Sequence, residues 1–218
     1  MDKEQLSVDL HARGLVKFGD FILKSKQWSP VYFNLRPLGS TDKRSILNAD
    51  EQLLVRDRIL GCYAKTLERF DDISWPDHMI GVPEGGLTLT AMLGQYASRS
   101  VLQMRVKEKE HGQSVGIEGD FYENELVVVV DDILSTGISV ANFVPTLAEK
   151  GLITRGVCVL IDREQGGKET LEASGVEVES AIRATEIYDI LHYTKRITDD
   201  EHSLVTAYQR GEITSRLS

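Results

Sequence analysis

The strongest chemical signal in this chain lies at residues 127–139. The order there is Val-Val-Val-Val-Asp-Asp-Ile-Leu-Ser-Thr-Gly-Ile-Ser. It predicts a buried strand that ends at Asp131 and Asp132, then a turn of small residues, then a helix that runs to about Lys150. Ligands of open α/β sheets bind beyond the carboxyl ends of the strands, and a helix N-terminus favours anions. The turn at 135–139 is therefore suited to hold a phosphate monoester.

The side chains of this turn support the same chemistry. Hydroxyl donors are available from Ser135, Thr136 and Ser139, and Gly137 lets the backbone approach a ligand closely. The paired carboxylates suit the vicinal hydroxyls of a ribose, and one of them can also face Mg²⁺ and its waters. The nucleotide-triphosphate loop Gly-x-x-x-x-Gly-Lys-Ser/Thr is absent. Either half of the pattern alone would be typical of a strand end or a helix cap, but the combination is far more specific.

A second chemical signal is the basic segment 105–112, Arg-Val-Lys-Glu-Lys-Glu-His-Gly. In an extended conformation one face collects four potential cations, which suit a diphosphate: Arg105, Lys107, Lys109 and His111. Glycines at 112, 116 and 119 with few apolar neighbours predict a mobile loop that closes over a bound substrate. The alternative is a solvated hairpin, and we favour that interpretation for Glu108 and Glu110.

The elements that must position these residues alternate in type from residue 79 onward. Short β-rich runs separated by helical stretches occupy 79–82, 101–106, 126–130, 156–161 and 176–181. This alternation predicts an α/β fold with a central parallel sheet flanked by helices. The run 126–130 is apolar at every position, so we expect it to lie in the middle of the sheet.

The segments outside this core are shorter. The spacing of apolar residues predicts a long amphipathic helix over 50–70, short strands at 21–23 and 31–33, and terminal helices at 185–193 and 199–210. We expect a single domain, 1–218, in which 1–48 forms a small N-terminal hood lobe and 49–218 forms the α/β core with the C-terminal helices.

Composition limits the classes of function. The net charge of −9 argues against a protein whose main task is to grip nucleic-acid phosphates. No apolar run approaches the roughly 20 residues that span a bilayer, so we expect a cytoplasmic protein with no membrane partner. The two cysteines, Cys62 and Cys158, stand among apolar neighbours and are expected to be buried, reduced thiols.

The stretch 127–139 resembles the signature with which type I phosphoribosyltransferases bind phosphoribosyl diphosphate (PRPP). Three further segments resemble the orotate phosphoribosyltransferases of that family, in the same order along most of the chain. They are Phe-Gly-Asp-Phe-Ile-Leu-Lys-Ser at 18–25 with Ser-Pro-Val-Tyr-Phe-Asn at 29–34, the basic segment 105–112, and Leu-Ile-Asp-Arg-Glu-Gln-Gly-Gly at 160–167.

This resemblance implies transfer of phosphoribose from PRPP to orotate through a transition state with oxocarbenium character, with Mg²⁺ bound mainly by the PRPP diphosphate. The implied catalytic residues are Lys109, His111, Asp131 and Asp132. The implied PRPP-binding set is Lys24, Glu84, Gly85, Arg105, Lys107, Lys109, His111, Asp131, Asp132, Ile133, Leu134, Ser135, Thr136, Gly137, Ile138 and Ser139. The implied orotate-binding set is Tyr32, Phe33, Ser135 and Arg163, and a guanidinium fork suits the carboxylate and ring carbonyls of orotate. The resemblance also implies a homodimer that shares the loop 105–119 between subunits.

The chain departs from the family pattern at two positions. Many orotate enzymes have consecutive basic residues where this chain has Arg105-Val106, and many have a lysine where it has Gly85. Two other functions stay open: a phosphoribosyltransferase for another base, and a PRPP-sensing regulator that binds nucleic acid. The segments around Lys24 and Arg163 favour orotate, and a regulator would need a basic patch or appended DNA-binding helices. We expect no additional decarboxylase domain.

Overall fold

The computed structural model describes residues 2–23, 26–43, 45–70, 76–109 and 112–215, and at 106–109 and 112–115 it describes the backbone only. The chain forms two compact units, Leu60–Ala181 and the combination of Met1–Ile59 with Ile182–Ser218. The N-terminal segment thus groups with the C-terminal helices. The sequence pattern predicts instead that these helices belong with the core segment 49–218. The single-domain organisation stays a prediction. No helix among the described residues is long and apolar enough to cross a membrane.

The unit Leu60–Ala181 is built on a six-stranded sheet with the order β5-β4-β3-β6-β7-β8. Its strands are β3 (His78–Gly81), β4 (Val101–Lys109), β5 (Gly112–Glu118), β6 (Leu126–Leu134), β7 (Ile153–Asp162) and β8 (Val178–Arg183). The pairs β3·β4, β3·β6 and β6·β7 are parallel, and β4·β5 is antiparallel. The predicted α/β fold and the central place of residues 126–130 are confirmed.

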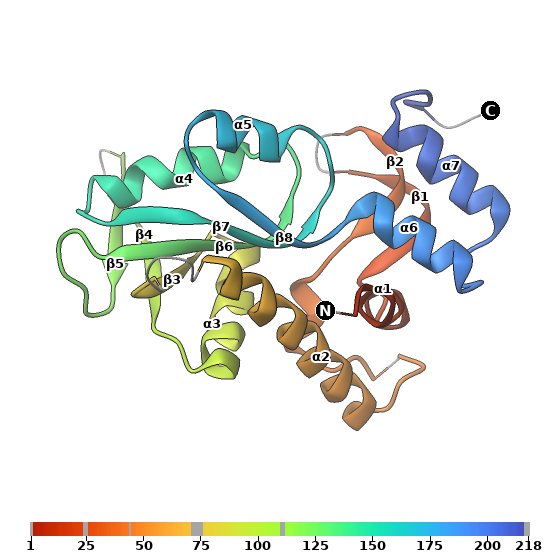
Figure 1. The fold of residues 1–218 in the computed structure, drawn as a ribbon, viewed down its shortest axis with the longest axis horizontal. Helices are drawn as coiled ribbons and strands as arrows, with labels where there is room; N and C mark the ends of the chain where they lie inside the picture. Colours follow the sequence, from red (N-terminus) through yellow and green to blue (C-terminus); the bar gives the residue numbers. More distant parts are fainter. Residues whose placement is uncertain (1, 24–25, 44, 71–75, 110–111, 216–218) are drawn as a thin grey trace. The chain divides into compact units, whose positions relative to one another are not determined.

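Helices cover both faces of this sheet. One face carries α4 (Ile138–Ala148) and α5 (Gly167–Ala173), and the other carries α3 (Gly85–Ala97) and the C-terminal part of α2 (Ala49–Leu67) (Figure 1). Val127 and Val129 of β6 pack in one buried cluster with Phe143 and Leu147 of α4. Because a buried branched side chain contributes about 1.5–3 kcal/mol, a strand that is apolar on both faces is stable only when both are covered.

The segment after Lys109 differs from the predicted mobile loop. Residues 112–118 form β5, which pairs with β4 in a hairpin whose register sets Arg105 opposite Gly116 and Lys109 opposite Gly112. The expected loop was therefore wrong for 112–118, and the hairpin alternative is the one that the structure has. Cross-strand hydrogen bonds satisfy the backbone of this polar stretch.

The second unit combines both ends of the chain. It contains α1 (Lys3–Ala12), the antiparallel pair β1 (Val16–Ile22) and β2 (Trp28–Phe33), the 3₁₀ turn η1 (Arg36–Gly39), the first part of α2, α6 (Ala184–Tyr193) and α7 (Asp199–Gln209). The short 3₁₀ turn η2 (Glu68–Phe70) follows α2 in the other unit. The predicted N-terminal strand pair, the long helix and both terminal helices are confirmed, although β1 begins five residues before the expected strand at 21–23.

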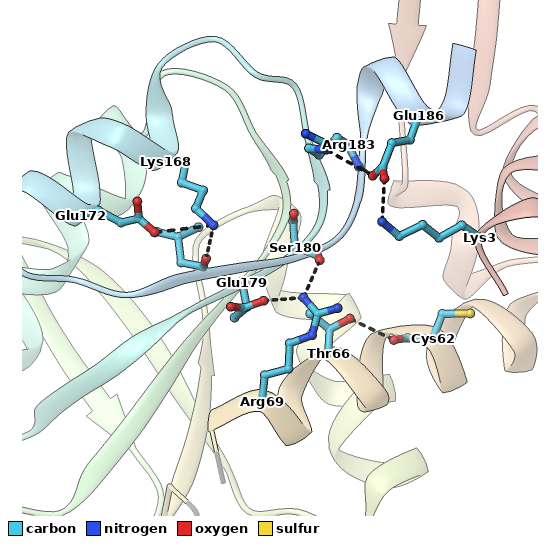
Figure 2. Close-up of polar contacts among 11 residues, drawn as sticks. Lys3, Cys62, Thr66, Arg69, Lys168, Glu172, Glu179, Ser180, Arg183 and Glu186 are labelled. Atoms are coloured by element: carbon cyan, nitrogen blue, oxygen red, sulfur yellow. Dashed lines mark hydrogen bonds and ion pairs between the residues drawn. The ribbon is translucent and has the colours of Figure 1, made fainter. Parts of the chain in front are cut away.

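Ion pairs tie distant segments together within each unit. Figure 2 shows Glu186 of α6 held by the ammonium group of Lys3, at 2.7 Å, and by the backbone N–H of Arg183, at 3.0 Å. Burial alone would raise the pKa of Glu186, but hydrogen bonds from Lys3 and from the backbone and side chain of Arg183, with the charge of Lys3, outweigh it and lower the pKa to about 2. In the sheet unit, Arg69 of η2 binds Glu179 of β8.

Candidate active site

The acidic pair lies inside β6 rather than after it. The strand continues to Leu134 because Asp131, Ile133 and Leu134 stay in register with Val159, Ile161 and Asp162 of β7. The expected strand end at Asp131 and Asp132 was therefore wrong by two residues. Asp131 is only 8% exposed, whereas Asp132 is half-buried.

The two carboxylates differ in charge state. Burial, followed by the neighbouring charge of Asp132, raises the pKa of Asp131 to about 8. At neutral pH the free protein therefore holds Asp131 largely protonated, next to a second carboxylate. Such a pair can donate one hydrogen bond and accept others, which matches the mixed donor and acceptor character of two vicinal hydroxyls.

A buried phenol holds the strand directly behind this pair. Tyr63 of α2 is fully buried, and its oxygen lies 2.6 Å from the carbonyl oxygen of Asp131 and 2.5 Å from that of Cys158. The apolar spacing that predicts the helix over 50–70 could not reveal this contact. Burial raises the pKa of Tyr63, so the phenol keeps the proton that it donates.

The predicted phosphate loop follows β6 directly. Gly137 has φ of +76° and caps α4, and the carbonyl oxygen of Gly137 accepts the N–H of Ala141 at 2.8 Å. Ser135 and Ile133 are half-buried, while Thr136, Ile138 and Ser139 are exposed. The side chain of Leu134 lies in the core.

A second loop interlocks with this one. The N–H of Arg163 donates to the carbonyl oxygen of Leu134 at 2.8 Å, and a Cβ on Gly167 would fall within 3 Å of Ser135 and Gly137. Asp162, also buried, accepts the N–H of Glu164 at 2.8 Å, and burial raises the pKa of this carboxyl. The structure thus brings Arg163, which is half-buried, beside the phosphate loop.

A third loop, 81–86, reaches the same end of β6. Glu84 is exposed and precedes α3, and Gly85 begins α3 against the carboxylate of Asp132. A Cβ on Gly86 would fall within 3 Å of the carbonyl oxygen of Val130. The Gly-Gly pairs at 85–86 and 166–167 are the signal that could have revealed both close approaches from the sequence.

The predicted diphosphate-binding residues of the basic segment that the structure describes lie on β4. The guanidinium of Arg105 pairs with Glu118 at 2.7 Å on the exposed hairpin, and the backbone of Lys107 and Lys109 lies in β4. Lys24 and His111 lie outside the described residues.

Two predicted base-binding residues belong to the other unit, on β2. Tyr32 is 38% exposed and stacks on Phe21 at 5.4 Å between ring centroids. Phe33 is buried and lies 6.4 Å from the ring of Tyr188. A hollow of about 380 Å³ in the same unit is lined by residues between Thr41 and Gln52, and none of the predicted site residues lines it.

Known proteins resemble this chain in sequence and in fold. The phosphoribosyl transferase domain family matches residues 59–189. The orotate phosphoribosyltransferase of Pyrobaculum islandicum is 33% identical over 82% of this chain and 85% of that protein. The crystal structure of orotate phosphoribosyltransferase from Aeropyrum pernix has a TM-score of 0.66 and 31% identity, covering 88% of this chain and 99% of that one.

Some relatives are much longer. The alignment with the "Bifunctional enzyme PyrF/PyrE" of Nostoc sp. has 31% identity. It covers 93% of this chain but only 39% of that protein. It covers 35% of the uridine 5'-monophosphate synthase of Bos taurus, at 32% identity. The chain thus spans less than two fifths of these relatives. Its relatives of similar length include the orotate phosphoribosyltransferases of Pyrobaculum islandicum and Aeropyrum pernix. Because the family match, the sequence identity to these relatives and the shared fold agree, this chain belongs to the phosphoribosyl transferase family.

Proposed function

We propose that this chain is an orotate phosphoribosyltransferase, which transfers phosphoribose from PRPP to orotate and releases diphosphate in pyrimidine nucleotide biosynthesis. The bond between C1′ and the diphosphate oxygen breaks, a bond from C1′ to a ring nitrogen of orotate forms, and the proton of that nitrogen leaves. The observation that carries the proposal is the meeting of three loops at the end of β6, around an acidic pair and a phosphate-sized turn.

In this proposal the acidic pair binds the ribose. Asp131 and Asp132 hydrogen-bond the 2′- and 3′-hydroxyls, and the loop 135–139 takes the 5′-phosphate at the N-terminus of α4. The charged carboxylate of Asp132 also stabilises the positive charge that develops on the ribose as diphosphate departs. The rigid contact of Tyr63 with the Asp131 carbonyl oxygen supports this role, because a positioned group loses little entropy on binding.

Magnesium enters this scheme mainly with PRPP. Among the described residues no group of three or more His, Cys, Asp or Glu side chains could hold a metal ion by itself. Mg²⁺ generally binds proteins through one or two carboxylates and takes its other ligands from phosphates and water. One carboxylate of the pair, that of the half-buried Asp132, would face the ion, and the bound ion would neutralise charge on the departing diphosphate.

The orotate assignment rests on Arg163. Its backbone is fixed to Leu134, and its guanidinium, as a planar fork of donors, matches a carboxylate or two carbonyl oxygens. By resemblance, Tyr32, Phe33 and Ser135 complete the base site, and Lys24 lies where base and PRPP meet.

The diphosphate is assigned to the hairpin. In the proposal Arg105, Lys107, Lys109 and His111 contact it, and Glu84 and Gly85 approach it through their backbone. Arg105 must first leave Glu118, but an exposed ion pair such as this contributes about 0–1 kcal/mol, so the exchange is easy.

We further propose a homodimer in which each hairpin serves the partner's site. Lys109→Ala subunits and Asp131→Asn/Asp132→Asn subunits, each inactive alone, would then complement after dissociation and reassociation. With free exchange about half of the dimers are mixed and each has one intact site, so roughly a quarter of the wild-type activity should return. Activity that stays at the level of the separate variants, despite demonstrated exchange, would contradict shared sites.

A panel of bases tests the substrate. The protein is incubated with PRPP and Mg²⁺ and with orotate, uracil, adenine or hypoxanthine, and diphosphate release is followed. We expect turnover with orotate to be at least about a hundredfold faster than with any other base. The other bases lack the carboxylate, so binding them leaves polar groups of the site without a partner. Faster turnover with another base would show that orotate is not the acceptor.

A further inference from the structure

Gly85 touches one of the proposed ribose-binding carboxylates. A Cβ at position 85 would lie 2.7 Å from Oδ1 of Asp132, 2.9 Å from its Cγ and 3.0 Å from its Oδ2. All three distances are shorter than carbon contacts of this kind normally allow. The carboxylate of Asp132 therefore occupies the space in which a side chain at position 85 would begin, and position 85 is a glycine.

The backbone around Gly85 has no room to retreat. The N–H of Gly86 donates to the carbonyl oxygen of Val82 at 2.9 Å, and that of Val82 donates to Val130 of β6 at 2.9 Å. A Cβ on Gly86 would also fall within 3 Å of the Val130 carbonyl oxygen. On the helix side, the hydroxyl of Thr90 donates to the carbonyl oxygen of Gly86 at 2.6 Å. The first turn of α3 is thus fixed to the strand that carries Asp132.

The mobile part of this contact is the carboxylate. Asp132 can relieve a clash by rotating about its side-chain bonds, and that rotation moves its oxygens away from the place where α3 begins. Position 85 is also the one where the chain has glycine instead of the lysine of many orotate enzymes. A longer side chain there would meet the same carboxylate.

We infer that Gly85 is a positioning residue for Asp132: the missing side chain sets where this carboxylate meets the ribose of PRPP. The inference rests on the proposed function, because it assumes that Asp132 binds the ribose. It does not require Gly85 to touch the substrate through a side chain of its own.

A double-mutant cycle tests this role. The dissociation constant for PRPP with Mg²⁺ is measured by calorimetry for wild type, Gly85→Ala, Asp132→Ala and the double variant. We expect Gly85→Ala to raise the constant about tenfold in the wild-type background, and less than about twofold in the Asp132→Ala background, where no carboxylate remains to be displaced. An equal loss in both backgrounds, or no loss in either, overturns the inference.

Two controls separate positioning from folding. Thr88→Ala changes an exposed residue in the same turn of α3 and should leave PRPP affinity at the wild-type value. Gly85→Ala should not lower the melting temperature, because alanine favours helix over glycine. A lowered melting temperature would mean that the backbone, rather than Asp132, gives way, and would also overturn the inference. Wild-type protein that fails to bind PRPP would instead refute the proposed function.

Discussion

The buried carboxyl of Asp131 predicts an unusual dependence of stability on pH. Its folded-state pKa of about 8 lies far above the roughly 3.9 of an exposed aspartate in an unfolded chain. Between these two values the folded protein holds one proton more than the unfolded chain. The extra bound proton stabilises the folded protein. This stabilisation is complete below about pH 4 and is lost as the pH rises through the folded-state pKa.

The size of the effect follows from one bound proton. A difference of a full proton changes the free energy of unfolding by about 1.4 kcal/mol per pH unit. The titrations of Asp131 and Asp132 are coupled, and solvent relaxation weakens the effect of burial. We therefore expect this site to lower the free energy of unfolding by about 0.7–1.4 kcal/mol for each unit of rising pH.

Urea unfolding of wild type and Asp131→Asn isolates this contribution. Asparagine mimics the protonated carboxyl, and every other titrating group is common to both proteins. Between about pH 5.5 and 7.5 the variant should gain roughly 1.5–3 kcal/mol relative to wild type. A constant difference between the two proteins over this range would refute a raised pKa at Asp131.

Two other substitutions probe the surroundings of the pair. Tyr63→Phe removes the buried hydroxyl that donates to the Asp131 carbonyl oxygen, so the free energy of unfolding should fall by about 1–3 kcal/mol, and calorimetry should show the melting temperature several degrees lower. An unchanged melting temperature would mean that the contact contributes nothing. Arg163→Ala should lower kcat/KM for orotate about tenfold to a hundredfold, because a charge-assisted hydrogen bond is worth about 1.5–3 kcal/mol, while PRPP binding stays nearly intact. A loss of PRPP affinity with normal orotate kinetics would contradict the assignment of Arg163 to the base.

Much of the fold follows from local pattern. An all-apolar strand at 126–130 has to be covered on both faces, so its central place in the sheet was predictable. The extension of β6 through Asp131 and Asp132 was not, because carboxylates are rare within sheets. There, pairing with β7 and burial of Leu134 outweigh the local preference.

The candidate site was predictable in its residue types but not in its contacts. Amphipathic spacing places Tyr63 in the interior, yet it cannot show which carbonyl oxygen meets the phenol. The Gly-Gly pair at 85–86 signals a close approach, but only the fold reveals that Asp132 is the neighbour. Glycines and charges at 112–119 indicate a loop by composition, and antiparallel pairing with β4 overrides that local preference. The roles of Lys24 and His111 stay predictions, since both lie outside the described residues.

The most direct test of the central claim compares wild type with Asp131→Asn/Asp132→Asn in a mixture of PRPP, Mg²⁺ and orotate. Orotate consumption and diphosphate release are measured together, and circular dichroism verifies that both proteins are folded. We predict that wild type consumes one orotate for each diphosphate released, while the folded double variant loses at least about a hundredfold in kcat. The claim would be contradicted by a folded double variant that turns over like wild type, or by a wild type that does not consume orotate.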